Sequence, residues 1–167
     1  MQEVLHNQLE EILGALNQAD HGQASSHASG PYWSYIGVAR EDDRQKGEYS
    51  PILYPTKVFK LLHFENIWLS PTPGKPSKGW DAGSERILTI GIFEHKVSKR
   101  RLATFNTHLD NAGSEARKNS VAMIIDKIEQ IRAAWDPTVA NKNASFDGVG
   151  LNYFLAGDFN SFPTQGR

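Results

Sequence analysis

The sequence predicts a layered α/β domain, and three observations support this. Two segments carry apolar residues at the spacing of an amphipathic helix. Several short segments are rich in aromatic and β-branched residues, which is typical of strands. After the first of these helical segments come strands, then the second helix, then another strand, an order that indicates an α/β layered fold. With 167 residues, the chain is one domain or a large part of one.

The N-terminal half is expected to begin with a helix and to continue with short strands. The helix is predicted from about Val4 to Gln18. Its apolar stripe consists of Leu5, Leu9, Ile12, Leu13 and Leu16. Strands are predicted at residues 31–38, 52–54 and 58–63, from their aromatic and β-branched content.

A long loop rich in Pro and Gly, SPTPGKPSKGWDAGS, lies in the middle of the chain and contains Trp80. Long loops that keep a large aromatic residue are often binding loops. Trp80 could equally cover an edge of the core, and the sequence leaves both interpretations open.

The C-terminal half contains the strongest signals for regular structure. Strands are predicted at residues 86–94 and 101–107, and the basic turn HKVSKR between them indicates a hairpin. A helix is predicted over residues 114–135, and Pro137 is expected to end it. One face of this helix carries Val121, Ile124, Ile125, Ile128, Ile131 and Trp135. The last strand is predicted at residues 151–156.

Composition excludes several classes of function. Eighteen basic and nineteen acidic residues give a formal net charge of −1, which argues against broad, non-specific binding of nucleic acids. A small local phosphate site is still compatible with this balance. The absence of cysteine excludes thiolate nucleophiles and zinc–cysteine sites. No apolar stretch approaches the length needed to span a membrane.

Two of the predicted strands end in polar side chains. RLATFNTHLD presents Asn106, His108 and Asp110, and NYFLAGDFNSFP presents Asp158 and Asn160. Ligand-binding and catalytic groups in α/β sheets gather where strands end. If these two strands are neighbours, the five side chains converge on one rim.

Each of these residues also has a purely structural interpretation. Asp158 and Asn160 could stabilise a turn by binding their own backbone, and His108 could be a structural histidine. Asp110 follows His108 by two residues, so in extended chain it shares a face with His108 and could orient the imidazole. Glu3 could simply favour the dipole of the first helix.

Taken together, the motifs resemble those of the endonuclease/exonuclease/phosphatase superfamily. QEVL near the N-terminus, NTHLD after a strand and LAGDFNS at the next strand end occur in the expected order. The linking pieces GEYSPILY and IWLSPTP–PSKGWDA are also similar, and they point towards the compact, deadenylase-like branch. The resemblance covers essentially the whole chain. It implies an α/β sandwich of two packed, mainly antiparallel sheets flanked by helices.

The resemblance also implies a chemistry. Hydrolysis of a phosphoester needs neutralisation of charge at the phosphoryl oxygens and an activated water. Glu3 is the expected protein ligand of Mg²⁺ or Mn²⁺, because hard cations prefer carboxylate oxygens. Asp158 would position or deprotonate the water, and Asn160 would hold the phosphate or the metal-bound water without adding negative charge.

Three more residues receive roles from the same chemistry. His108, kept in one tautomer by a partner, would donate a hydrogen bond to a phosphoryl oxygen. Arg86 and Tyr54 are possible phosphate contacts, with roles at the edge of the core as the alternative. The substrate would be a phosphoester: a small molecule, a lipid head group or a short nucleic acid.

The sequence departs from the superfamily at both ends. The metal-binding asparagine expected on a strand before QE has no counterpart, and neither has the closing serine–aspartate–histidine motif. We therefore expect residues 1–167 to form a single domain that lacks its first strand and its closing strands. Such a chain is expected to be weakly stable and nearly inactive by itself.

Two other functions compete with this one. The chain could be a non-catalytic binding module descended from such an enzyme. It could also be a zinc hydrolase built on His108 and Asp110, although no other histidine has the spacing of a zinc ligand.

Overall fold

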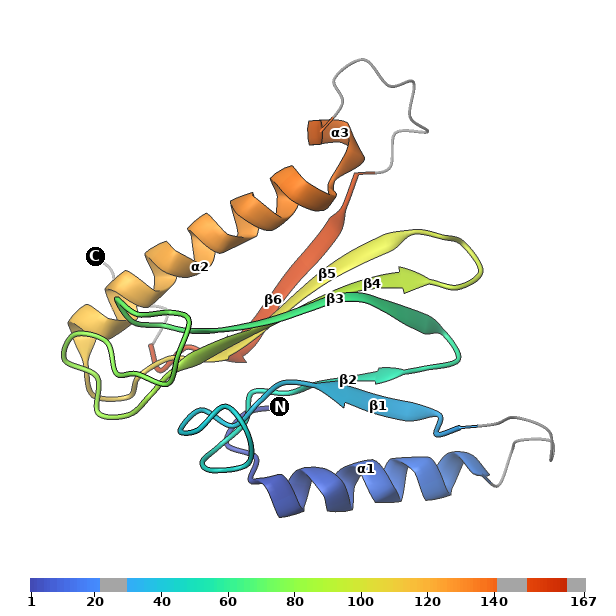
Figure 1. The fold of residues 1–167 in the computed structure, drawn as a ribbon, viewed down its shortest axis with the longest axis horizontal. Coiled ribbons are helices and arrows are strands. Elements are labelled where there is room, and N and C mark those ends of the chain that lie inside the picture. The colour runs from blue at the N-terminus through green and yellow to red at the C-terminus, as the bar shows by residue number, and fades with distance from the viewer. Residues whose placement is uncertain (22–29, 141–149, 162–167) are drawn as a thin grey trace.

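The strands of the described residues form two sheets, which lie face to face (Figure 1). The computed structural model describes residues 1–21, 30–140 and 150–161. The smaller sheet pairs β1 (Trp33–Ile36) with β2 (Ile52–Pro55) in antiparallel orientation. The larger sheet has the order β3-β4-β5-β6, formed by Phe59–Trp68, Ile87–His95, Arg101–His108 and Asn152–Asp158. The helices are α1 (His6–His21), α2 (Ser114–Trp135) and α3 (Pro137–Ala140).

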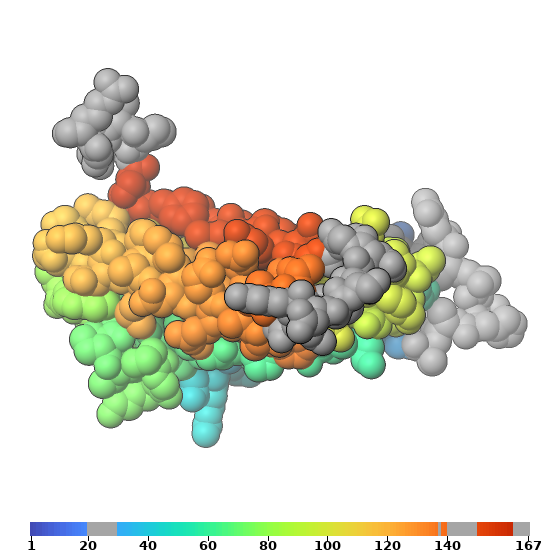
Figure 2. Space-filling view, turned by 90° about the horizontal axis from the view of Figure 1, so that it is seen from above, coloured from blue at the N-terminus to red at the C-terminus, as the bar shows by residue number. Residues whose placement is uncertain are grey.

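The elements form layers, with helices on the outside and the two sheets between them. Helix α1 runs along the outer side of β1 and β2, and α2 covers the outer face of the larger sheet (Figure 1). Figure 2, seen from above, shows β6 extending beside α2. The predicted α/β sandwich with two packed, mainly antiparallel sheets is therefore confirmed.

The main core lies between the larger sheet and α2. Buried side chains on β4 and β5, such as Ile90 and Phe105, pack with Ile124 and Ile131 of α2. Seven consecutive residues of β4, Ile87–Phe93, are buried, because the strand has neighbours on both faces. This explains why its sequence is a nearly continuous apolar run instead of an alternating pattern.

The register of the larger sheet determines where the polar strand ends lie. Strands β5 and β6 are parallel neighbours, and His108 pairs with Asp158. Strand β4 runs antiparallel to its neighbours, and Ile87 at its start pairs with Trp68 at the end of β3. The end of β3, the start of β4 and the ends of β5 and β6 therefore lie at one edge, which we call the site edge. The prediction that the two polar strand ends meet is confirmed.

The N-terminal helix differs from the prediction. Helix α1 begins at His6 instead of Val4, because Val4 forms an antiparallel bridge with Tyr49 and Glu3 has a left-handed φ of 56°. Of the predicted apolar stripe, Leu9 is fully buried, whereas Leu5 and Ile12 are exposed. The sequence pattern therefore identified the helix but overstated its buried face.

The second helix has the predicted bounds, 114–135. It ends because Asp136 takes an extended conformation, and the short helix α3 starts at Pro137. Val121 and Ile125, predicted to share the core face, are 42% and 54% exposed. The residues that face the sheet are instead centred on Ala116, Ser120, Ile124 and Ile131. Within residues 1–21, 30–140 and 150–161, no helix combines the length and apolar character needed to cross a membrane.

Gly91 allows the two sheets to approach each other closely. A Cβ atom at this position would lie 2.5 Å from Cδ1 of Ile36 in β1 and 2.5 Å from Cε2 of Phe93. We expect Gly91→Ala to lower the free energy of unfolding by about 1–3 kcal/mol, the usual cost of overpacking. Urea denaturation followed by circular dichroism measures this effect.

Gly74→Ala is the matched control, because a Cβ atom there meets nothing within 4 Å. Equal urea midpoints of unfolding for Gly91→Ala and Gly74→Ala would show that the two sheets can move apart at Gly91 without loss of stability.

Candidate functional site

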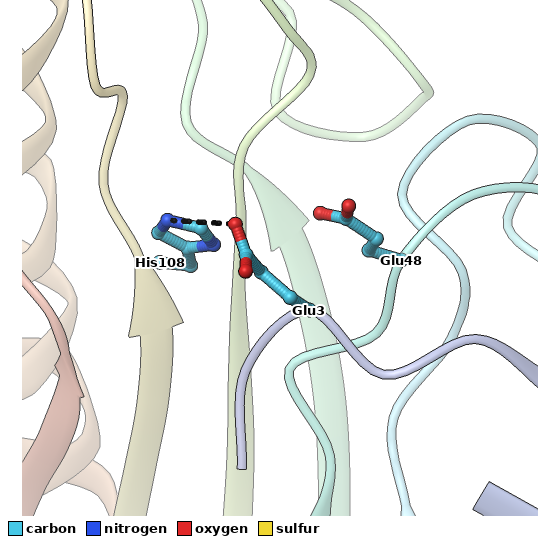
Figure 3. Close-up of side chains that lie close together, drawn as sticks. All are labelled: Glu3, Glu48 and His108. Atoms are coloured by element: carbon cyan, nitrogen blue, oxygen red, sulfur yellow. Dashed lines mark ion pairs between the residues drawn. The ribbon is translucent and has the colours of Figure 1, made fainter. Parts of the chain in front are cut away.

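Three chain segments bring Glu3, Glu48 and His108 together at the site edge (Figure 3). Each residue offers one potential ligand atom, and these three atoms lie within 4.8 Å of one another. Glu3 belongs to the N-terminal segment, Glu48 to the segment before β2, and His108 to the end of β5. We call these residues the Glu3–Glu48–His108 cluster.

The side chain of Asn106 fixes the N-terminal segment against β5. Its Nδ2 atom donates to the carbonyl oxygens of Met1, at 2.8 Å, and Pro51, at 2.9 Å. Its Oδ1 atom accepts a 2.7 Å hydrogen bond from Nε2 of Gln2. We call this arrangement the Asn106 clamp. Because Glu3 directly follows Gln2, the clamp determines where the Glu3 carboxylate can lie.

His108 is only 6% exposed and contacts residues from both sides of the site. Its Nε2 atom lies 3.9 Å from Oε1 of Glu3 and 3.0 Å from Nδ2 of Asn160. Since the Asn160 amide is a donor, Nε2 must accept, and the proton of a neutral imidazole lies on Nδ1. Burial, reinforced by the guanidinium of Arg86, lowers the pKa of His108 below its usual value, which favours this neutral form.

Asp158 and Asn160 lie beside His108, as predicted. Asp158 pairs with His108 across β5 and β6. Its Oδ1 atom accepts a 2.9 Å hydrogen bond from the backbone N–H of Asn160, which has a left-handed φ of 45°. The Asn160 amide also donates to the carbonyl of Leu109 at 2.8 Å. The turn interpretation of these residues is therefore observed, and the turn itself places both side chains next to the imidazole.

Asp110 is buried, and its partners are backbone N–H groups and Arg86 instead of the imidazole. Its carboxylate accepts hydrogen bonds from five donors: the backbone N–H groups of Gly83, Ser84, Ala112 and Gly113, and Nε of Arg86. None of the hydrogen bonds among the described residues joins Asp110 to His108. This differs from the prediction that Asp110 orients the ring. The reason is that β5 ends at His108, so the alternation of an extended chain does not continue to Asp110.

The hydrogen bonds to Asp110 favour its ionised form strongly. Burial opposes ionisation, but the bonds from Gly113, Gly83 and Arg86 hold the pKa of Asp110 well below its usual range. Asp110 thereby ties together the 83–86 segment, the end of β5 and the start of α2. It is also not a member of the cluster that contains His108, so the alternative of a zinc site on these two residues gains no support.

The structure brings Arg86 to the site and leaves Tyr54 outside it. Arg86 is buried, with Nε 3.1 Å from Oδ2 of Asp110, and it lines a small cavity together with His108. Tyr54 instead packs on Phe93, with ring centroids 4.8 Å apart. Phe93 lies near the opposite end of β4 from the site edge. The edge-of-core alternative is therefore the one that the structure supports for Tyr54.

Glu48 was missed as a candidate from the sequence. It lies in GEYSPILY, where it precedes a buried segment, and Oε2 forms a 2.7 Å ion pair with Nη1 of Arg40. The signal for Glu48 that the sequence offered was an acidic residue directly before the mainly apolar run YSPILY. Its proximity to Glu3 depends on the bridges that Tyr49 forms with Val4 and Ala39, which the sequence does not reveal.

Within the Glu3–Glu48–His108 cluster, the two carboxylates are the groups that could hold a hard divalent cation, because the Nε2 lone pair of His108 already accepts from Asn160. Two carboxylates from separate chain segments converge there, and carboxylate oxygens are the preferred protein ligands of Mg²⁺. The Glu3 side chain is largely exposed, so the cluster is open to solvent on that side.

Trp80, in the long loop before β4, is 43% exposed and has a left-handed φ of 54°. Its suggested role in binding stays a prediction.

The chain is similar to several solved structures and to one curated protein. An endonuclease/exonuclease/phosphatase family protein from Bacteroides thetaiotaomicron is 34% identical with a TM-score of 0.77, covering 98% of this chain and 49% of that one. The mannosyl-6-phosphatase of the same organism is 33% identical with a TM-score of 0.74, covering 95% and 49%. The Ccr4 exoribonuclease subunit of the CCR4-Not complex of Mycosarcoma maydis is 26% identical in an alignment 148 residues long, and the match covers 76% of this chain and 22% of that protein.

No protein-family model matches the sequence. The chain spans about half the length of these solved structures. Over that span, the comparisons confirm in both fold and sequence the predicted resemblance of this chain to the endonuclease/exonuclease/phosphatase superfamily.

Proposed function

We propose that the chain carries part of the catalytic site of a metal-dependent phosphoester hydrolase. The observation that carries this proposal is the meeting of Glu3, Glu48 and His108 beside Asp158 and Asn160 at one sheet edge. The names of the similar proteins, a phosphatase and an exoribonuclease among them, support phosphoester hydrolysis as the reaction type.

Glu3 and Glu48 would hold the cation, Mg²⁺ or Mn²⁺. When bound, such a cation neutralises charge on the phosphoryl group and on the leaving oxygen. Asn106 contributes indirectly, because its clamp holds the segment that carries Glu3. Arg40 contributes in the same way through its ion pair with Glu48.

The remaining groups act on the water and the phosphate. The Asp158 carboxylate accepts the proton of the attacking water or positions it for in-line attack. His108, neutral because of its lowered pKa, donates its Nδ1 proton to a phosphoryl oxygen. Asn160 fixes the imidazole in this tautomer through its bond to Nε2 and adds no negative charge to the site.

Binding and removal of the metal test the proposal. Titration with Mn²⁺, followed by electron paramagnetic resonance, should reveal one site, and Glu3→Gln and Glu48→Gln should each weaken it at least about tenfold, since each loses one anionic ligand. Glu94→Gln is the control, because Glu94 lies at the other end of β4 and pairs with Lys99.

Hydrolysis is measured on the polypeptide in its full natural length. EDTA should abolish cleavage of nitrophenyl phosphate esters, and Mg²⁺ or Mn²⁺ should restore it. If no ester is cleaved with either metal while Mn²⁺ still binds, the chain is a binding module and the enzymatic proposal is refuted.

A further inference from the structure

A small cavity next to the Glu3–Glu48–His108 cluster is lined by residues of the 40–50 segment and of the site edge. Arg40, Glu48, Arg86 and His108 are among its lining residues. The cavity leaves about 10 Å³ for the centre of a water-sized atom. That is room for about one oxygen atom and excludes an alkyl or aryl group.

The Oε2 atom of Glu48 is buried and accepts no hydrogen bond within the described residues, but it is ion-paired with Nη1 of Arg40 at 2.7 Å. Three lining side chains have a buried nitrogen without a hydrogen-bond partner among the described residues: Nε of Arg40, Nη1 of Arg86 and Nδ1 of His108. All three are donors, because guanidinium nitrogens always carry protons and the bond from Asn160 to Nε2 places the imidazole proton on Nδ1. Buried donors of this kind are normally satisfied, so their gathering at one cavity indicates an acceptor that binds there.

The acceptor that fits best is an anionic oxygen. A water molecule can accept two hydrogen bonds, whereas a phosphoryl oxygen carries negative charge and can accept three. Bonds from guanidinium groups to such an oxygen are charge-assisted and strong. Both guanidinium groups are already held in place, since Arg86 is bonded to Asp110 and Arg40 to Glu48, so little ordering is needed on binding.

Arg40 is fixed by its backbone as well as by its side chain. Its N–H donates to the Glu48 carbonyl at 3.2 Å, and its carbonyl accepts a 2.6 Å bond from Nε1 of Trp68. Trp68 ends β3 at the site edge. The position of Arg40 is therefore set by the sheet that carries His108, although Arg40 itself lies in an irregular segment.

We propose that this cavity receives one unsubstituted phosphoryl oxygen and that Arg40 thereby makes the site selective for phosphomonoesters. The inference rests on the proposed hydrolase function. A monoester has three oxygens free of substituents, so one can enter the cavity while two stay on the open side of the site. A diester has two, and placing one in the cavity leaves a single free oxygen for the groups on the open side.

The reaction that follows is ordinary hydrolysis. The oxygen of a water molecule forms a bond to phosphorus, the bond from phosphorus to the ester oxygen breaks, and the products are an alcohol and inorganic phosphate. The proton lost by the water passes to Asp158, and the leaving oxygen takes up a proton from solvent.

Arg40→Lys is the decisive variant, because lysine can keep the ion pair with Glu48 but lacks the Nε donor. Arg132→Lys is the matched control: Arg132 also pairs with a glutamate and has an unpartnered Nε, but it lies on α2. For each protein, in its full natural length and with Mg²⁺, kcat/KM is measured for 4-nitrophenyl phosphate and for bis(4-nitrophenyl) phosphate.

We expect the unsubstituted protein to favour the monoester at least about tenfold. Arg40→Lys should lower kcat/KM for the monoester about 10- to 100-fold and for the diester less than about 3-fold, the range expected for one charge-assisted hydrogen bond. Arg132→Lys should change neither. Preference for the diester, or equal losses on both substrates in Arg40→Lys, would overturn the proposal, because a purely structural role affects both alike.

Binding of inorganic phosphate separates this inference from the proposed function. Calorimetry should show binding to the unsubstituted protein, weakened at least about tenfold in Arg40→Lys. If neither ester is cleaved but phosphate binding depends on Arg40, the hydrolase function fails and the anion site stands. If phosphate binds equally to both proteins, the anion site is refuted whatever the hydrolytic activity.

Discussion

Asp158→Asn is expected to lower kcat for phosphoester hydrolysis by about 10²- to 10⁴-fold, the usual contribution of a general base. Asparagine keeps an oxygen that can accept the bond from the backbone N–H of Asn160, so the turn after β6 should be retained. What is lost is the negative charge that accepts or orients the proton of the water. Initial rates at saturating substrate and Mg²⁺, on the polypeptide in its full natural length, measure the effect.

His108→Ala belongs to the same experiment, because the two residues face each other across β5 and β6. We expect a loss of similar size, and the double variant should be little worse than either single one, as for groups that act as a unit. Asp126→Asn, an exposed substitution on α2, is the control. Activities of both single variants close to that of the unsubstituted protein would mean that the site has been assigned to the wrong residues.

Asp110→Asn is expected to lower the free energy of unfolding by about 3–5 kcal/mol, the cost of breaking a buried ion pair from one side. The variant leaves the Arg86 guanidinium buried without its carboxylate and weakens the bonds from four backbone N–H groups. Urea unfolding at neutral pH measures this loss, and Asp126→Asn should cost less than about 0.5 kcal/mol.

The pH dependence of the unfolding free energy distinguishes loss of the ion pair between Asp110 and Arg86 from a general loss of packing. Because the pKa of Asp110 is lowered on folding, its contribution is complete above the ordinary carboxyl value of 3.8 and is lost as the pH falls below it. The difference in unfolding free energy between Asp110→Asn and the unsubstituted protein should therefore shrink below about pH 4. A constant difference down to pH 2 would show that the carboxylate charge is not what stabilises this part of the fold.

The sequence located the polar strand ends correctly and left open only whether β5 and β6 are neighbours, which the structure shows. His108 and Asp158 both close an apolar strand, and parallel neighbours with the same polarity must meet at one edge. Residues 114–135 were predicted correctly because a long periodic segment followed by proline is a strong local signal.

Features that depend on long-range pairing could not be predicted in the same way. Glu48 approaches Glu3 because Tyr49 pairs with both Val4 and Ala39, contacts that join distant parts of the chain. Asp110 failed as a partner of the imidazole because the alternation rule holds only while the strand continues. For Tyr54 the sequence left a phosphate contact and a core-edge role open, because it does not show which end of the sheet Tyr54 occupies; the structure supports the core-edge role.

The Asn106 clamp has a consequence for the entropy of metal binding. A glutamate on an unrestrained segment would sample many positions, and capturing a cation would require those positions to be given up. Here the Asn106 amide binds the Met1 carbonyl and the Gln2 side chain, and its third bond, to the Pro51 carbonyl, fixes the amide itself when the protein folds. The Glu3 carboxylate is therefore present beside Glu48 at a high effective concentration before any cation arrives. Most of the conformational entropy of this ligand is therefore lost when the sheet folds and not when the ion binds.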